Sequence, residues 1–150
     1  MTTQTVSDTQ KTAELTTSRW IRIGLQAAIA AILAVLLTQA IILAWLPELD
    51  AFKPLDSFAR TALFTLIPAM GATAVFAWLV KKQDQPQAKF LWIAAGFLLI
   101  SFIPDYLLPV PNRTLAGSTA AAFMHLVAGI VTVAMILAGY ARSGKASAAR

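Results

Sequence analysis

The sequence contains no cysteine, a single histidine and few charged residues. Of its 150 residues, 58% are hydrophobic and only 13% are charged. The lack of cysteine excludes disulfides, thiolate metal ligands and thiol nucleophiles. A soluble domain usually carries about 25% charged residues, so this chain has too few to form an ordinary water-soluble surface. The composition therefore predicts an integral membrane protein, with the lipid bilayer as its principal partner.

Other absences limit the chemistry. One histidine cannot supply the paired axial ligands of a membrane b-type haem or a three-histidine metal site. The chain has no glycine-rich phosphate loop, and its apolar segments do not hold the carboxylate pair that acid–base enzymes commonly use. We therefore expect no cofactor, no metal ion and no enzymatic activity.

Four long apolar runs cover most of the chain, at about residues 20–46, 57–80, 90–108 and 118–141. Membrane barrels use strands of about 10 residues with alternating polarity, so runs of this length indicate helices. The short connections make consecutive helices antiparallel neighbours. The predicted fold is all-α, an antiparallel four-helix membrane bundle at residues 19–142. Residues 1–18 are predicted to be a disordered tail, and residues 143–150 a second tail.

Polar and aromatic residues near the span ends predict caps and anchors. Asp56 and Ser57 precede the second span, and Ser118 or Thr119 begins the fourth, where short polar side chains cap helices. Aromatic residues near the span ends predict contacts with the membrane interface: Trp20, Trp45, Trp78, Trp92 and Tyr140.

The cations are unevenly divided between the two sides of the predicted bundle. Nine lie on the side of the termini and of the second loop: Lys11, Arg19, Arg22, Lys81, Lys82, Lys89, Arg142, Lys145 and Arg150. Three lie on the opposite side: Lys53, Arg60 and Arg113. The positive-inside bias places both termini in the cytoplasm. Because topology explains the net charge of +5, we do not expect nucleic acid as a partner.

Asp105 and His125 are the polar residues that most need an explanation. Asp105 lies near the outer end of the third span and His125 at a similar depth in the fourth. An ionisable group inside a span is a functional-site hypothesis by default, since its insertion is costly. One alternative is a structural pair that holds the two spans in register, and the other is simple exposure to interfacial water. The sequence leaves all three interpretations open, and also whether the two side chains touch.

Other polar residues fall at similar depth. Gln39, Arg60, Thr65 and Ser101 could join Asp105 and His125 in one outer-half polar site that binds a ligand or a proton. Each also has a local explanation, such as a bond to its own helix or, for Arg60, a bond to lipid phosphate. Pro104, beside Asp105, and Pro68 in the second span predict helix kinks.

Small residues recur along the first span. The stripe consists of Ala27, Ala31, Ala34 and Thr38. Such stripes let helices approach closely, so this face is expected to contact a neighbouring helix, a membrane partner or a second copy in a homodimer.

Two short motifs resemble a known family. They are Ser101-Phe-Ile-Pro-Asp-Tyr-Leu-Leu-Pro, with Pro104-Asp105, and Ala122-Phe-Met-His-Leu-Val-Ala-Gly, with Met124-His125. With the alanine-rich first span and the basic second loop, residues 20–141 resemble an uncharacterised family of small four-span membrane proteins frequent in actinobacteria. The resemblance implies a four-helix protein of the bacterial inner membrane and supplies no activity.

The function predicted from the sequence is a non-enzymatic accessory or small-ligand-binding membrane protein that uses Asp105 and His125. The alternative is a small proton-linked transporter that acts as a dimer, in which the pair exchanges a proton with the outside. The third hypothesis, after the binding protein and the transporter, is a membrane enzyme.

Overall fold

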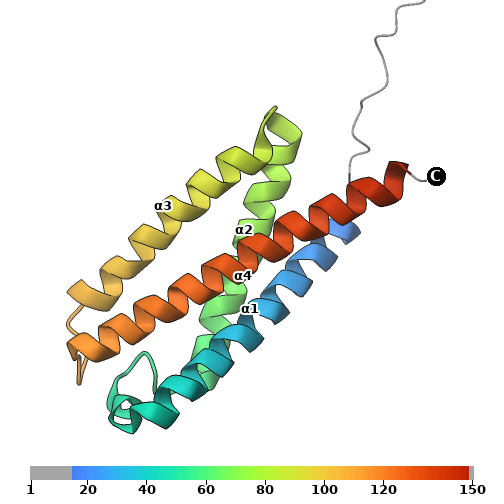
Figure 1. Cartoon of the computed structure of the whole chain (residues 1–150). Helices are drawn as coiled ribbons and strands as arrows, with labels where there is room; N and C mark the ends of the chain where they lie inside the picture. The colour runs from blue at the N-terminus through green and yellow to red at the C-terminus, as the bar shows by residue number, and fades with distance from the viewer. Residues whose placement is uncertain (1–14, 149–150) are drawn as a thin grey trace, which may run out of the picture.

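The computed structural model describes the backbone of residues 15–148 and the side chains of residues 15–144. It contains helices α1 (Thr17–Trp45), α2 (Phe58–Lys82), α3 (Pro86–Leu107) and α4 (Leu115–Ala148), with a short 3-10 helix, η1 (Pro47–Ala51). Consecutive long helices run in opposite directions (Figure 1). We call the end that carries η1 and the α3–α4 turn the loop end. The opposite end, where α1 begins and the α2–α3 turn lies, is the terminal end.

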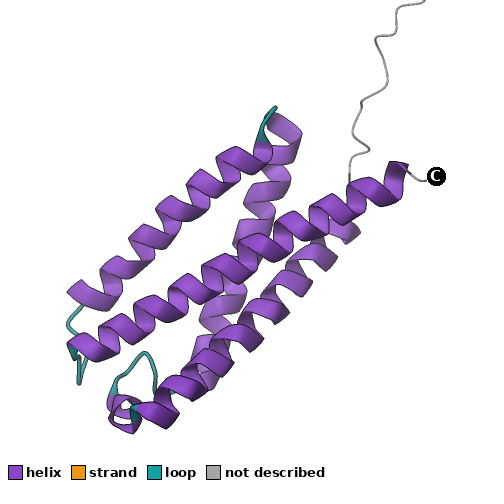
Figure 2. Ribbon diagram, in the orientation of Figure 1, coloured by secondary structure: helices purple, strands orange, loops and turns teal. Residues whose placement is uncertain are grey.

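The described chain is all-helical, with turns and loops only between the helices (Figure 2). All four long helices are long and apolar enough to cross a membrane. The helices match the predicted spans in number and order but extend beyond most of their ends. Residues 17–18 and 143–148, predicted to belong to the tails, are helical. They include one glycine, Gly144, but no proline that would stop a helix. The tail predicted for residues 1–14 and 149–150 lies outside the described residues.

Two helix starts test the predicted caps. Ser57 caps α2, since its hydroxyl accepts a hydrogen bond from the backbone N–H of Arg60 at 3.3 Å. The prediction for the fourth span is wrong. Thr114 occupies the cap position of α4 and accepts from the N–H of Gly117 at 3.0 Å, so the helix begins at Leu115. Ser118 lies one turn inside and has another role, described below.

An aromatic cluster at the terminal end joins all four helices. The Trp20 ring stacks on Tyr140 and meets Phe76 edge-on, with ring centroids 5.9 Å apart in both pairs. Phe76 also contacts Phe90, at 4.8 Å, and Tyr140, at 5.3 Å. Trp20 and Tyr140 were predicted as interfacial anchors but pack in this core, since they are on the inner faces of their helices. Trp45, Trp78 and Trp92 point outward.

The bundle is asymmetric. Helix α1 packs extensively against α2 and α4, whereas α3 contacts mainly α4 and, to a lesser extent, α2 (Figure 1). The buried residues of α3 lie near its two ends: Pro86 and Phe90 at one, Asp105 at the other. Asp105 is thus the only buried residue in the loop-end half of α3, where Leu98, Ser101 and Phe102 are partly buried.

Candidate functional site at the α3–α4 junction

The site begins with a missing hydrogen bond in the α3 backbone. In a continuing helix the Asp105 carbonyl would accept from the N–H four residues later, but that residue is Pro109, which has none. Ser118 of α4 replaces this donor: its hydroxyl lies 2.6 Å from the Asp105 carbonyl oxygen, and both residues are buried. Pro109 thus leaves the Asp105 carbonyl without a partner in its own helix, and this carbonyl joins α3 to α4 through Ser118.

The Asp105 side chain makes the second link. Its Oδ2 lies 2.9 Å from Nδ1 of His125, two helical turns after Ser118 on α4. Asp105 is only 7% exposed, while the His125 side chain is 44% exposed. The structure therefore establishes the contact that the sequence left open: a buried carboxylate holds an imidazole that is accessible from outside the bundle.

Three further hydrogen bonds close the α3–α4 turn. Arg113 donates from Nη1 to the carbonyls of Tyr106, at 2.6 Å, and Leu108, at 3.3 Å. A guanidinium at a helix C-terminus satisfies carbonyls that lack helical partners and opposes the negative end of the helix dipole. The Tyr106 hydroxyl lies 3.3 Å from Thr119 Oγ1. These contacts restrain the backbone on both sides of Asp105.

The two ring nitrogens of His125 have different roles in this pair. A neutral imidazole that donates from Nδ1–H to the carboxylate keeps a lone pair on Nε2, and a protonated one forms an ion pair and offers Nε2–H as a donor. In either state Asp105 orients the ring. The arrangement can therefore bind one polar group, or exchange one proton, through Nε2.

Gln39 belongs to a different part of the loop end. It is fully buried, and its Nε2 donates to the carbonyl of Leu55 at 2.9 Å, while its Oε1 has no hydrogen-bond partner among the described residues. Leu55 lies in the loop between η1 and α2, and its side chain is buried with those of Leu49 and Phe52. Gln39 thus fastens this loop to α1.

The remaining members of the predicted polar site also have local partners. Thr65 donates to the carbonyl of Thr61 at 2.8 Å, and Ser101 to that of Leu98 at 2.7 Å. Arg60 forms an ion pair with Asp56 and donates to the Lys53 carbonyl. Within the described part of the chain, no hydrogen bond connects Gln39, Arg60, Thr65 or Ser101 to Asp105 or His125.

Asp56 is the centre of this exposed charge cluster. Partial burial acts to raise the pKa of Asp56, but the hydrogen bonds and positive charges of Arg60 and Lys53 outweigh it, so the pKa lies below its ordinary value. Lys53 Nζ lies 3.3 Å from Asp56 Oδ2. Arg60 therefore has a carboxylate partner within the protein.

Half of the small-residue stripe is buried inside the bundle. Ala27 and Ala31 are fully buried against neighbouring helices, and Ala34 and Thr38 are partly exposed. A second copy would thus find only Ala34 and Thr38 of this stripe accessible. Pro68 and Pro104 both lie inside helices, where kinks were predicted.

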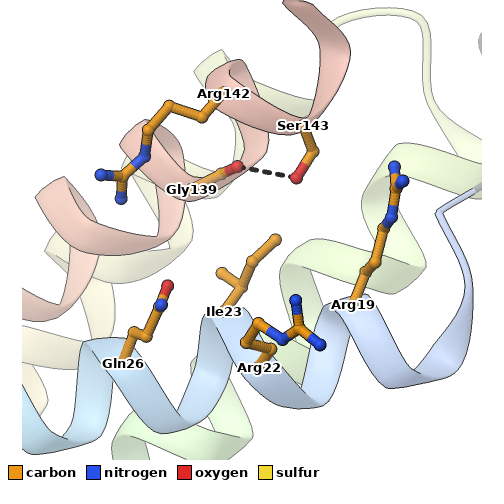
Figure 3. Close-up of a pocket in the computed structure, with 7 residues that line it drawn as sticks. All are labelled: Arg19, Arg22, Ile23, Gln26, Gly139, Arg142 and Ser143. Atoms are coloured by element: carbon orange, nitrogen blue, oxygen red, sulfur yellow. Dashed lines mark hydrogen bonds between the residues drawn. The ribbon is translucent and has the colours of Figure 1, made fainter. Parts of the chain in front are cut away.

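Sequence reasoning missed a cleft at the terminal end. Arg19, Arg22 and Gln26 on α1, with Arg142 and Ser143 on α4, line a cleft of about 370 Å³ with Ile23 and Gly139. Figure 3 shows Arg19 and Arg22 extending from α1 and Arg142 from α4, with Ile23 between the two helices. The sequence signal was present in the i, i+3 spacing of Arg19 and Arg22, but their charges were used only to orient the bundle.

The chain is similar to one family of proteins. A family model whose description reads "Family of unknown function (DUF6069)" matches residues 15–143. This range includes all four helices except the last residues of α4. No curated protein and no solved structure matches the chain.

Proposed function

The chain belongs to this uncharacterised family, and we propose that it is a non-enzymatic membrane protein that binds a small ligand or a partner subunit through His125. The observation that carries the proposal is the 2.9 Å contact in which buried Asp105 orients a half-exposed imidazole. The Ser118 hydroxyl already joins the two helices through the main-chain carbonyl of Asp105. The imidazole pairs with the buried Asp105 side chain through Nδ1 and, being half exposed, leaves Nε2 available as a binding group.

The proposed location is the cell membrane, with both termini in the cytoplasm. It is supported by the four candidate spans and by the placement of the cations on either side. In this orientation the Asp105–His125 pair lies in the half of the bundle that faces the outside of the cell.

The test uses the single histidine of the chain. Protein labelled with ¹⁵N-histidine, placed in nanodiscs, gives imidazole signals from His125 alone. We expect the Nε2 signal to move, with little change at Nδ1, when purified lipid is replaced by a native membrane extract. Identical signals in the two preparations would contradict a ligand or partner at Nε2.

Stability separates binding from a purely structural pair. We expect His125→Gln to melt within a few degrees of the parent, since interhelical hydrogen bonds in membranes contribute about 0.6 kcal/mol on average. Ser118→Ala provides the comparison, because Ser118 is buried and satisfies a backbone carbonyl. If His125→Gln lowers the melting temperature more than Ser118→Ala does, the imidazole is structural and the proposal fails.

The same pair supports a second candidate function, a proton-linked transporter acting as a dimer. A buried carboxylate in contact with an accessible imidazole is an arrangement used in membrane proton relays. This candidate requires pH-driven flux in liposomes that is lost in Asp105→Asn and in His125→Gln. Binding without transport instead predicts the same flux as empty liposomes.

A further inference from the structure

The arginine cleft at the terminal end is far from the Asp105–His125 pair, and its composition needs its own explanation. Arg19 and Arg22 come from the first two turns of α1, and Arg142 comes from the last part of α4. Three guanidinium groups from two helices therefore border one cleft, with the Gln26 amide beside them (Figure 3). Guanidinium groups present paired N–H donors whose spacing fits phosphate oxygens.

The positive charge of the cleft is not balanced by the described residues. None of the salt bridges among residues 15–144 includes Arg19, Arg22 or Arg142. The first turn of α1 contains no acidic residue, and its N-cap, Thr16, makes no side-chain cap bond. A helix N-terminus carries partial positive charge, so Arg19, in the first turn of α1, stands where a helix disfavours cations. A bound anion would balance the charge of the arginines and would also interact favourably with the positive end of the α1 dipole.

The base of the cleft is close-packed. A Cβ atom added to Gly139 would lie 3.1 Å from the Ile23 side chain, so α1 and α4 approach closely here. Ile23 is itself buried in the aromatic cluster of the terminal end. Ser143 donates to the Gly139 carbonyl at 3.0 Å, which leaves its hydroxyl oxygen as an acceptor rather than a donor toward the cleft. The cleft thus has a fixed apolar base and a rim of guanidinium donors.

We propose that this cleft binds a phosphate group through Arg19, Arg22 and Arg142. The phosphate is carried by an anionic membrane lipid or by a small soluble molecule. The cleft volume of about 370 Å³ lies within the range usual for sites that bind small molecules. Basic pockets between helices at the cytoplasmic end of a bundle are suited to anionic headgroups. This site is independent of the function proposed for His125.

The experiment measures the melting temperature of the full chain in zwitterionic lipid–detergent micelles at constant ionic strength. Phosphatidylglycerol is added in one series, and inorganic phosphate or glycerol 3-phosphate in another. We expect a rise of about 3–6 °C with a ligand at roughly ten times its Kd. The variant Arg19→Gln/Arg22→Gln/Arg142→Gln should lose this rise. The control Lys81→Gln/Lys82→Gln/Lys89→Gln removes equal charge at the same end, outside the cleft, and should keep it.

A rise with phosphatidylglycerol that only the arginine variant loses supports the proposal with a lipid as the source. The same pattern with a soluble phosphate alone supports it with a soluble ligand. Equal loss in both triple variants, or no rise with any of the three probes, overturns the proposal. If the arginine triple variant does not fold, Arg142→Gln takes its place and should at least halve the rise. An unchanged rise in that single variant also overturns it.

Discussion

The Ser118 hydroxyl donates to the main-chain carbonyl of Asp105 at 2.6 Å, and this bond joins α3 to α4. It exists because Pro109 has no N–H to offer that carbonyl. The carboxylate of the same residue positions His125. One residue of α3 therefore provides both the backbone attachment and the charged half of the candidate site, so the two roles can be separated by mutation.

Ser118→Ala should destabilise the protein by about 1–2 kcal/mol, because it leaves a buried carbonyl without a partner. Unfolding in mixed detergent measures the change. Ser101→Ala is the matched control: Ser101 donates only to the Leu98 carbonyl of its own helix. We expect the control to lie within about 0.5 kcal/mol of the parent, as most mutations outside special features do. Equal effects of the two substitutions would show that the interhelical bond contributes nothing particular.

Gly117→Ala should destabilise the loop end. The added Cβ atom would lie 2.9 Å from the Phe52 ring, and Phe52 is buried. Overpacking of this kind costs about 1–3 kcal/mol. Gly71→Ala is the control, since a Cβ atom there meets nothing within 4 Å. Thermal unfolding should separate the two variants, with the control at or above the parent. A Gly117→Ala protein as stable as the parent would mean that Phe52 moves away freely.

Phe76→Ala should be among the most damaging substitutions at the terminal end, because Phe76 touches Trp20, Phe90 and Tyr140. Lipid is as apolar as this core, so the expected loss is mainly packing. A cavity of roughly 100 Å³ corresponds to about 2 kcal/mol. Phe97→Ala removes the same ring from a position that is 61% exposed. The unfolding free energies should differ by most of that amount, and similar values would refute the assigned core.

Asp56 should contribute to acid sensitivity. Its folded-state pKa is lowered, so its contribution to stability is present above the unfolded value of about 3.9 and is lost as pH falls through the folded value. Melting temperatures of the parent should fall between about pH 5 and pH 2 more steeply than those of Asp56→Asn. Asp84→Asn removes a charge from the α2–α3 turn, outside the salt bridges of the described residues. It should retain the parental slope.

The orientation can be tested without removing native thiols, since the chain has no cysteine. Asp50→Cys lies at the loop end and Gln85→Cys at the terminal end, and both positions are exposed. In intact cells, a membrane-impermeant maleimide should label Asp50→Cys at once. It should label Gln85→Cys only after the membrane is permeabilised. The reverse result would place the termini outside and move the arginine cleft to the outer surface.

Several parts of the fold followed from the sequence because they depend on local properties. The four helices follow from runs of apolar residues, and Ser57 caps α2 as its residue type predicts. The cap of α4 was misplaced by four or five residues because Thr114, Ser118 and Thr119 are all suitable, and only the backbone path selects Thr114. Trp20 and Tyr140 were misassigned because aromatic residues near span ends suit both an interface and a core.

The candidate site was only partly accessible to sequence reasoning. Similar depth along two spans identified Asp105 and His125 as potential partners, and they are in contact. The same argument grouped Gln39, Arg60, Thr65 and Ser101 with them, yet Arg60, Thr65 and Ser101 bind carbonyls close to them in the sequence and Gln39 binds the Leu55 carbonyl in the loop before α2. Depth along a helix does not specify which way a side chain points.

The sequence by itself determined the class of the protein, the number of its helices, their order and the scarcity of reactive groups, since these depend on composition and on the length of apolar runs. Only the tertiary structure decided which faces meet: Asp105 with His125, Gln39 with Leu55, and the arginines of α1 with Arg142. The physical reason is that helices apolar on all sides carry no strong periodic signal for their rotation. Their rotation is set by close packing at positions such as Gly24, Gly117 and Gly139, and by a few buried hydrogen bonds.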